Sequence, residues 1–209
     1  MDELVEQYLR GYSAREDEVR RATRARSEEA DVAAVPPDVG AALEFFARLT
    51  SARHVAEVGT GGGYSGLWLL AGMDPRGSLT TIAADREHQA LAQRAFADAR
   101  VADRVRSMLG PALSVLPRLA DANYDLVYLD AATTEDPDCL LHAKRLLRGG
   151  GLLLAAVHAV TDSINSITTM GDAGVGAFAE AVSEDPQLLP LLLPLGEGLL
   201  AAVRLRPSS

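Results

Sequence analysis

The sequence predicts an α/β fold, in which a mostly parallel β-sheet is covered by helices on both faces and closed by an antiparallel hairpin. From Arg53 onward, short apolar runs alternate with longer amphipathic segments, which is the pattern of repeated strand–helix units. A glycine-rich segment, EVGTGGGYSG at residues 57–66, directly follows the first apolar run. Near the end, two apolar runs are separated only by a turn at residues 196–198. This turn is too short for a helical crossover, so the two strands must be antiparallel.

The order of elements follows from the same patterns. We expect residues 1–34 to form a helical extension of one or two exposed helices outside the main core of a single 1–209 domain. Pro36 and Pro37 interrupt the chain, and Asp38 is placed to cap the apolar helix that follows. We expect strands at residues 54–58, 79–83, 105–109, 125–129 and 152–157, with helices near 65–71, 87–99, 113–119, 138–147 and 175–182. Pro190 and Pro194 lie in the first strand of the hairpin, which predicts an edge strand because proline cannot donate a ladder hydrogen bond.

Composition excludes several classes of partner. The formal net charge of −9 argues against nucleic acid, because binding phosphates requires a basic face. No apolar run approaches the roughly 18 residues needed to cross a bilayer, and the amino terminus has no apolar signal core. The single cysteine, Cys139, rules out an internal disulfide and suits a reducing compartment. We therefore expect a cytoplasmic protein without a membrane partner.

The glycine-rich segment fits two different cofactors. Gly61, Gly63 and Gly66 satisfy the G-x-G-x-x-G dinucleotide pattern, which leaves a nicotinamide-dependent oxidoreductase open. Gly59, Gly61 and Gly63 also form a G-x-G-x-G pattern two residues after Glu57. A carboxylate at that place repels a pyrophosphate but suits the ammonium group of S-adenosylmethionine. The closing hairpin and the little chain left for a separate substrate domain also favour S-adenosylmethionine.

Several segments together resemble one enzyme family. EVGTGGGYSGLWL at residues 57–69, YDLVYLDA at 124–131, RLLRGGG at 145–151 and PLGEGLLAAV at 194–203 are similar to bacterial O-methyltransferases related to catechol and caffeoyl-CoA O-methyltransferases. The similarity covers residues 35–205. It implies a Rossmann-like class I methyltransferase that uses S-adenosylmethionine, with strand order 3-2-1-4-5-7-6, a small-molecule methyl acceptor and often a homodimer.

The resemblance also assigns cofactor-binding positions. Its loop and methionine-end contacts fall on Glu57, Gly59, Thr60, Gly61, Gly63 and Ser65, and its adenine-side contacts on Pro111 and Ala112. The acidic residue that would hold the ribose falls on Ala83, and the nearest carboxylate is Asp85. Asp85 could reach the ribose hydroxyls if the strand ends early, or it could be the N-cap of the next helix.

The metal site of the family is incomplete in this sequence. Metal-dependent members hold Mg²⁺ with an aspartate after the fourth strand and an Asp-Asn pair after the fifth, which lowers the pKa of the acceptor hydroxyl. Asp130 keeps the first position, but Ala156 and Val157 replace the pair, and Thr133 replaces an expected lysine. We therefore predict no metal ligands.

Two residues are candidates for catalysis. Asp130 is expected to position the acceptor or the methionine end of the cofactor, and His158 could take the acceptor proton, although an exposed loop histidine is the alternative. The leading hypothesis is methyl transfer to a hydroxyl of a small molecule. A non-catalytic relative that binds the cofactor or a partner stays open, because the metal and lysine positions are substituted.

Overall fold

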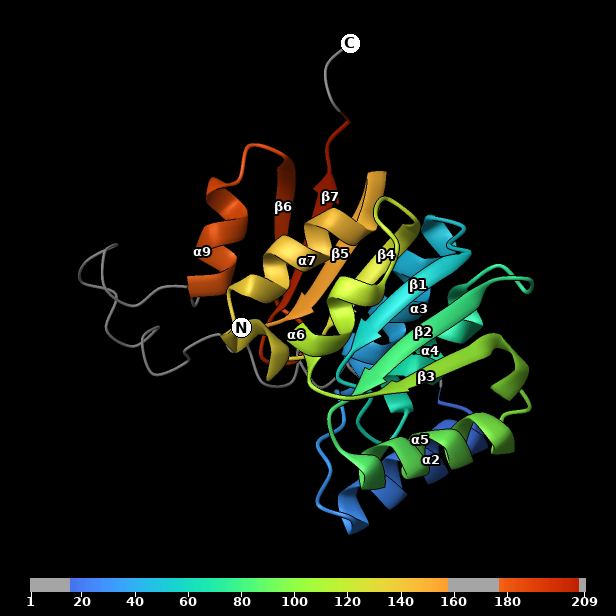
Figure 1. The fold of residues 1–209 in the computed structure, drawn as a ribbon. Coiled ribbons are helices and arrows are strands. Elements are labelled where there is room, and N and C mark those ends of the chain that lie inside the picture. The colour runs from blue at the N-terminus through green and yellow to red at the C-terminus, as the bar shows by residue number, and fades with distance from the viewer. Residues whose placement is uncertain (1–15, 158–176, 207–209) are drawn as a thin grey trace, which may run out of the picture.

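The computed structural model describes residues 16–157 and 177–206, which form one seven-stranded sheet with helices on both faces (Figure 1). The strand order is β3-β2-β1-β4-β5-β7-β6, as predicted. The strands are β1 His54–Val58, β2 Ser78–Ala83, β3 Val105–Leu109, β4 Tyr124–Leu129, β5 Leu147–Ala156, β6 Leu188–Leu193 and β7 Leu199–Arg204. β1 to β5 are parallel to one another, whereas β7 is antiparallel to both β5 and β6.

The helices form two layers on the sheet. Helices α3, α4 and α5 cover one face, and α6, α7 and α9 cover the other, each over its own apolar core (Figure 1). The helices are α2 Glu18–Glu29, α3 Pro37–Leu49, α4 Tyr64–Gly72, α5 Arg86–Asp98, α6 Ala112–Val115, α7 Asp138–Leu146 and α9 Ala177–Glu184. Within the described ranges, no helix is long and apolar enough to span a bilayer.

The register of the parallel strands determines where a ligand can bind. Val55 of β1 pairs with Leu79 of β2 and with Leu126 of β4, so the three strands end at nearly the same level. The loops that follow them therefore lie together at one edge of the sheet. In open α/β sheets this carboxyl edge, near the point where the strand order reverses, is the usual place for a ligand.

The structure corrects two predicted elements around the central strands. β5 begins at Leu147 rather than at residue 152, because the triple glycine enters the strand through a register shift against β4. Gly150 accommodates this shift with a positive φ of 82°. The helix predicted at 113–119 splits into α6 and a 3₁₀ turn, Leu116–Arg118, because Pro117 has no N–H with which to continue an α-helix.

Two predictions about proline-flanked segments also need correction. The N-cap of α3 is Pro36, whereas Asp38 lies in the first turn; Pro37 occupies the first helical position, which its fixed φ favours. The buried Asp38 instead accepts hydrogen bonds from the backbone N–H groups of Val39, at 2.9 Å, and Gly196, at 3.2 Å. β6 is the edge strand as predicted, but it ends at Leu193, so only Pro190 lies inside it.

The amino-terminal helix is not an exposed extension. α2 packs against α4 and α5 (Figure 1), and Arg20, Thr23 and Ser27 are buried. The Arg20 guanidinium pairs with Glu44 at 3.0 Å and lies over the Trp68 ring, 3.8 Å from its centroid. These polar contacts explain why a charged helix can pack on the core without an apolar stripe.

Candidate active site

The glycine-rich loop is fixed between two strands by its backbone. The N–H groups of Gly59 and Thr60 both donate to the carbonyl of Ile82 at the end of β2, each at 3.1 Å. On the other side, the Asp130 N–H donates to the carbonyl of Val58 at 3.0 Å. The loop therefore lies across the carboxyl ends of β1, β2 and β4, and the N-terminus of α4 begins immediately after it.

Glycine is required at two positions of this loop by both conformation and space. Gly59 has a φ of +94°, and a Cβ there would lie 2.0 Å from the Asp130 carboxyl carbon. Gly63, the N-cap of α4, has a φ of +89°, and a Cβ there would lie 2.9 Å from the Cα of Ala92. Since L side chains disfavour such φ values, the loop can pass this close to its neighbours only with glycine.

Glu57 anchors the loop from below rather than facing a cavity. Its side chain is fully buried, and its two carboxylate oxygens accept from the hydroxyls of Ser65 and Thr81, each at 2.6 Å. The Thr60 and Thr81 hydroxyl oxygens also lie 2.6 Å apart. With Glu57 ionised, Thr81 donates its only proton to Glu57, so Thr60 must donate to Thr81. This chain of hydroxyls ties the loop to β2.

Burial changes the protonation of Glu57. It raises the pKa of the carboxyl to about 7, despite the opposing effect of the Ser65 and Thr81 hydrogen bonds, and the nearby Asp130 adds to the rise. The assignment of Glu57 to the methionine end remains a prediction. In the structure, its carboxylate does not line either cavity described below.

Asp130 is the carboxylate that both cavities share. It follows β4, and one of its oxygens accepts from the backbone N–H of Thr133, at 2.9 Å, and from the Thr133 hydroxyl. Burial raises the pKa of the Asp130 carboxyl, and the two Thr133 hydrogen bonds oppose the rise. Thr133 therefore orients Asp130, and the second oxygen, Oδ2, has no hydrogen bond from within the described chain.

A cavity of about 590 Å³, here called the β2–β3 cavity, runs from the loop toward the ends of β2 and β3. Its walls include Gly59 and Gly61 of the loop, Ala83 at the end of β2, and Pro111 and Ala112 after β3. Val32 and Ala33, which follow α2, close it from the amino-terminal side. The predicted adenine-side residues thus lie in the same cavity as the glycine loop.

A second cavity, of about 420 Å³, continues past Asp130 and is called the β4–β5 cavity. It shares Ala33, Gly59, Thr60, Gly61, Asp130 and Ala132 with the first. Its own walls include Tyr128 of β4, together with Ala156 and Val157 at the end of β5. Ser65 lines only this second cavity. One ligand in each cavity would meet the other at the loop and Asp130.

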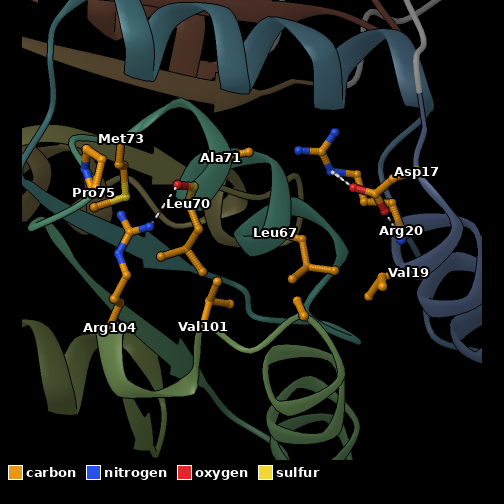
Figure 2. A pocket seen from close by; sticks show the side chains of 11 residues that line it. Asp17, Val19, Arg20, Leu67, Leu70, Ala71, Met73, Pro75, Val101 and Arg104 are labelled. Atoms are coloured by element: carbon orange, nitrogen blue, oxygen red, sulfur yellow. Dashed lines mark hydrogen bonds and ion pairs between the residues drawn. The ribbon is translucent and has the colours of Figure 1, made fainter.

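A third cavity, of about 300 Å³, lies on the other side of α4 and has no comparable chemistry (Figure 2). Figure 2 shows its two arginines directed at protein partners: Arg20 at Asp17, and Arg104 at the Leu70 carbonyl, at 3.3 Å. Arg104 also donates to the carbonyls of Gly77 and Asp74. Its charged groups already have partners, so we do not place a ligand there.

The structure places Asp85 as the N-cap of α5. Its carboxylate accepts from the backbone N–H groups of Glu87, at 2.6 Å, and His88, at 3.3 Å, and these bonds lower its pKa. The residue is exposed and does not line the β2–β3 cavity, whereas Ala83 and Ala84 do. The capping alternative is therefore the one that the hydrogen bonds support.

Replacing Asp85 gives a first test. Because a lost N-cap weakens a helix, Asp85→Ala is expected to lower Tm by roughly 2–4 °C while changing the affinity for S-adenosylhomocysteine by less than about twofold. Thermal unfolding and calorimetric titration measure the two effects. A tenfold loss of affinity would instead place Asp85 on the ribose.

The residues at the ends of β4 and β5 offer few ligands for a metal ion. Ala156 and Val157 offer no side-chain donor, and one oxygen of Asp130 is already bonded to Thr133. Within residues 16–157 and 177–206, no three His, Cys, Asp or Glu side chains are grouped to hold a cation. The described residues do not fit the family's Mg²⁺ site. The candidate base His158 lies outside them and stays a prediction.

The sheet order, the glycine loop over β1 and the paired cavities at its carboxyl edge define the class of Rossmann-like methyltransferases. The sequence narrows this class to one family. Residues 12–205 match the O-methyltransferase family, and the chain belongs to it.

Related sequences and solved structures agree with this assignment. A protein of Mycolicibacterium smegmatis, assigned by name to the O-methyltransferases, is 46% identical over 92% of this chain and 93% of its own length. The crystal structure of the O-methyltransferase TomG from Streptomyces achromogenes, in complex with S-adenosylmethionine, has a TM-score of 0.82 at 29% identity and covers 97% and 96% of the two chains. The Bacillus cereus O-methyltransferase with S-adenosylhomocysteine has a TM-score of 0.82 at 25% identity, covering 96% and 97%.

Sequence reasoning missed several residues of the site. Thr81 and Tyr128 were not singled out, although both are register partners of Glu57, in β2 and β4 respectively. Aligning the carboxyl ends of the strands would have found them, because partners in a parallel register point to the same face. The contribution of Val32 and Ala33 had no signal in the sequence, since it depends on how α2 packs.

Proposed function

We propose that this protein transfers the methyl group of S-adenosylmethionine to a hydroxyl group of a small molecule, without the divalent cation that related enzymes use. The observation that supports it is the pair of cavities that share the glycine loop and Asp130. One cavity joins the glycine loop to the predicted adenine-side residues Pro111 and Ala112, and the other is a partly apolar space for a second molecule.

The cofactor fits the β2–β3 cavity in the orientation that the family implies. Pro111 and Ala112 would lie against the adenine, and Gly59 and Gly61, which have no side chains, would let the ligand approach the loop backbone. S-adenosylmethionine supplies an activated methyl group and leaves as a neutral thioether. The role of the chain is then to hold the acceptor in line with that group.

Asp130 is the residue best placed to orient the acceptor. Thr133 holds one of its oxygens, and the other is left to accept a hydrogen bond from the acceptor hydroxyl. Because the pKa of the Asp130 carboxyl is raised, the group is a better proton acceptor than an ordinary aspartate. In this proposal Asp130 takes over the orienting role that a metal has in related enzymes.

A second candidate is a non-catalytic relative that binds the cofactor without transferring its methyl group. The specific observation in its favour is the absence of side-chain donors at Ala156 and Val157. The β4–β5 cavity argues against this second candidate. It has a volume of about 420 Å³ beside Asp130, and a protein that only binds the cofactor would not need this second space.

Methyl transfer measured with and without a chelator distinguishes a metal-free methyltransferase from a non-catalytic cofactor-binding protein. The protein is incubated with isotopically labelled S-adenosylmethionine and a panel of phenols and alcohols, and products are detected by mass. We expect labelled product whose rate changes less than about twofold between EDTA and added Mg²⁺, since no ligand set polarises the acceptor through a metal. A loss of all turnover in EDTA, restored by Mg²⁺, would contradict the metal-free proposal. Cofactor binding without product from any acceptor would favour the sensor.

A further inference from the structure

We propose that the β4–β5 cavity selects an uncharged or cationic acceptor with an apolar body, disfavours anionic acceptors, and uses the Tyr128 hydroxyl as the hydrogen-bond donor that holds the acceptor. This inference rests on the proposed function, because it assigns the second cavity to the methyl acceptor. It concerns the charge and shape of that molecule.

The charged residues that the structure describes along this cavity all have the same sign. Asp130, Glu135 and Glu197 line it, and none of the described residues that line it is Lys, Arg or His. Asp130 lies at the shared wall, and Glu135 follows on the 3₁₀ turn Thr133–Glu135. An anion entering this space would be repelled by the carboxylates of Asp130 and Glu135. A cationic or neutral molecule would not be repelled by these carboxylates.

Much of the remaining wall is apolar, although the hydroxyl-bearing residues Thr60, Tyr64 and Ser65 also line it. Val35, Pro36 and Val39 come from the segment before and within α3, and Ala156 and Val157 from the end of β5. These side chains can contact a ring or an alkyl body, but they cannot hydrogen-bond a second polar group. The cavity therefore fits a compact molecule with few polar atoms beyond the reacting hydroxyl.

Tyr128 is the second and independent observation that points to a ligand. Its side chain is fully buried, it lines only the β4–β5 cavity, and its hydroxyl has no hydrogen-bond partner among the described residues. A buried hydroxyl without a partner is costly, which is expected where a ligand completes the bond.

The surroundings of Tyr128 keep its hydroxyl protonated. Burial raises its pKa well above the usual value, and the carboxylates of Asp130 and Glu57 raise it further. Tyr128 can therefore donate a hydrogen bond at neutral pH and does not act as a base. Because Tyr128 and Asp130 line the same cavity, the Tyr128 hydroxyl could donate to an acceptor hydroxyl that in turn donates to Asp130.

Three phenols that differ mainly in charge test the selectivity. The protein is saturated with S-adenosylhomocysteine, and binding of 4-ethylphenol, 4-(2-aminoethyl)phenol and 4-hydroxyphenylacetate is measured by calorimetry. We expect the neutral and cationic phenols to bind at least about tenfold more tightly than the anion. Equal or tighter binding of the anion would overturn the proposal, as would the failure of all three phenols to bind.

Two glutamate variants that change the net charge equally show whether the charge preference arises in the cavity. Glu135→Gln is expected to lower the ratio between the affinities for the cationic and anionic phenols by about threefold. Glu180→Gln, on the exposed side of α9, changes the net charge equally and should leave this ratio unchanged. An identical response of the two variants would mean that the preference reflects the charge of the whole protein and not the cavity.

Tyr128→Phe tests the donor. We expect it to weaken binding of 4-ethylphenol by about fivefold or more, and to leave Tm unchanged or higher, because it removes a buried hydroxyl that has no protein partner. A residue that only supports packing would show the reverse: a lower Tm and unchanged phenol binding. Either of those two results would remove Tyr128 from the proposal.

Binding of S-adenosylhomocysteine, measured first, distinguishes failure of this inference from failure of the proposed function. Without that binding, the proposed methyltransferase activity itself fails. With it, a wrong charge order or an unaffected Tyr128→Phe variant overturns only the inference about the acceptor.

Discussion

Gly59→Ala is expected to weaken binding of S-adenosylhomocysteine by at least about 100-fold, because a single methyl group would disturb both the loop and Asp130. The φ of +94° is unfavourable for alanine, and the new Cβ would lie 2.0 Å from the Asp130 carboxyl carbon and from Oδ2. Asp130 cannot simply rotate away, because Thr133 holds its other oxygen. The loop must therefore move from the ends of β1 and β2, where the cofactor would lie. Isothermal titration calorimetry measures the affinity.

Gly149→Ala is the matched control. Gly149 lies in β5 away from both cavities, has no positive φ, and a Cβ there would first meet the flexible Arg206 side chain, at 3.2 Å from Cγ. We expect this variant to bind S-adenosylhomocysteine as the unaltered protein does. Equal affinities for Gly59→Ala and the unaltered protein would show that the cofactor does not depend on the close approach of Gly59 to Asp130.

The sequence predicted where the glycine loop lies, but not which of its glycines is in close contact with another residue. The pattern of apolar runs predicted all seven strands and the antiparallel hairpin, because burial on both faces leaves a direct signal in each strand. The place of the loop followed from the same reasoning, since glycines between a strand and a helix indicate a close backbone approach. The sequence could not show that Gly59 faces Asp130, because that contact joins residues far apart in the chain.

Errors arose where tertiary contacts override a local preference. The polar composition of residues 1–34 predicted exposed helices, yet α2 packs on α4 and α5 because Arg20 finds Glu44 and the Trp68 ring. Asp85 illustrates an alternative that composition could not decide. A carboxylate at that place suits both a ribose contact and an N-cap, and only the hydrogen bonds to α5 favour the cap.

Glu57→Gln is expected to remove a pH dependence from the stability of the ligand-free protein. The carboxyl has a pKa of about 7 in the folded state and about 4.5 when unfolded. Below pH 4.5 both states are protonated. Between 4.5 and 7 the unfolded state loses its proton first, so the free energy of unfolding falls as pH rises, by about 3 kcal/mol in total. Glutamine stays neutral, so we expect the variant to equal the unaltered protein near pH 4.5 and to exceed it by up to about 3 kcal/mol at pH 8.

Glutamine fits the hydroxyl chain because that chain can reverse. Its amide N–H₂ can donate to Thr81, and Thr81 can then donate to Thr60, an arrangement that is also available to Glu57 protonated on the oxygen facing Thr81. Urea unfolding of both proteins at several pH values measures the difference, and Glu184→Gln, at the exposed end of α9, is the control for net charge. If the free energies of unfolding of Glu57→Gln and the unaltered protein differ by a constant amount from pH 4.5 to 8, Glu57 is ionised in the folded protein throughout this range. The loop would then rest on a buried carboxylate whose charge the Ser65 and Thr81 hydroxyls alone can stabilise.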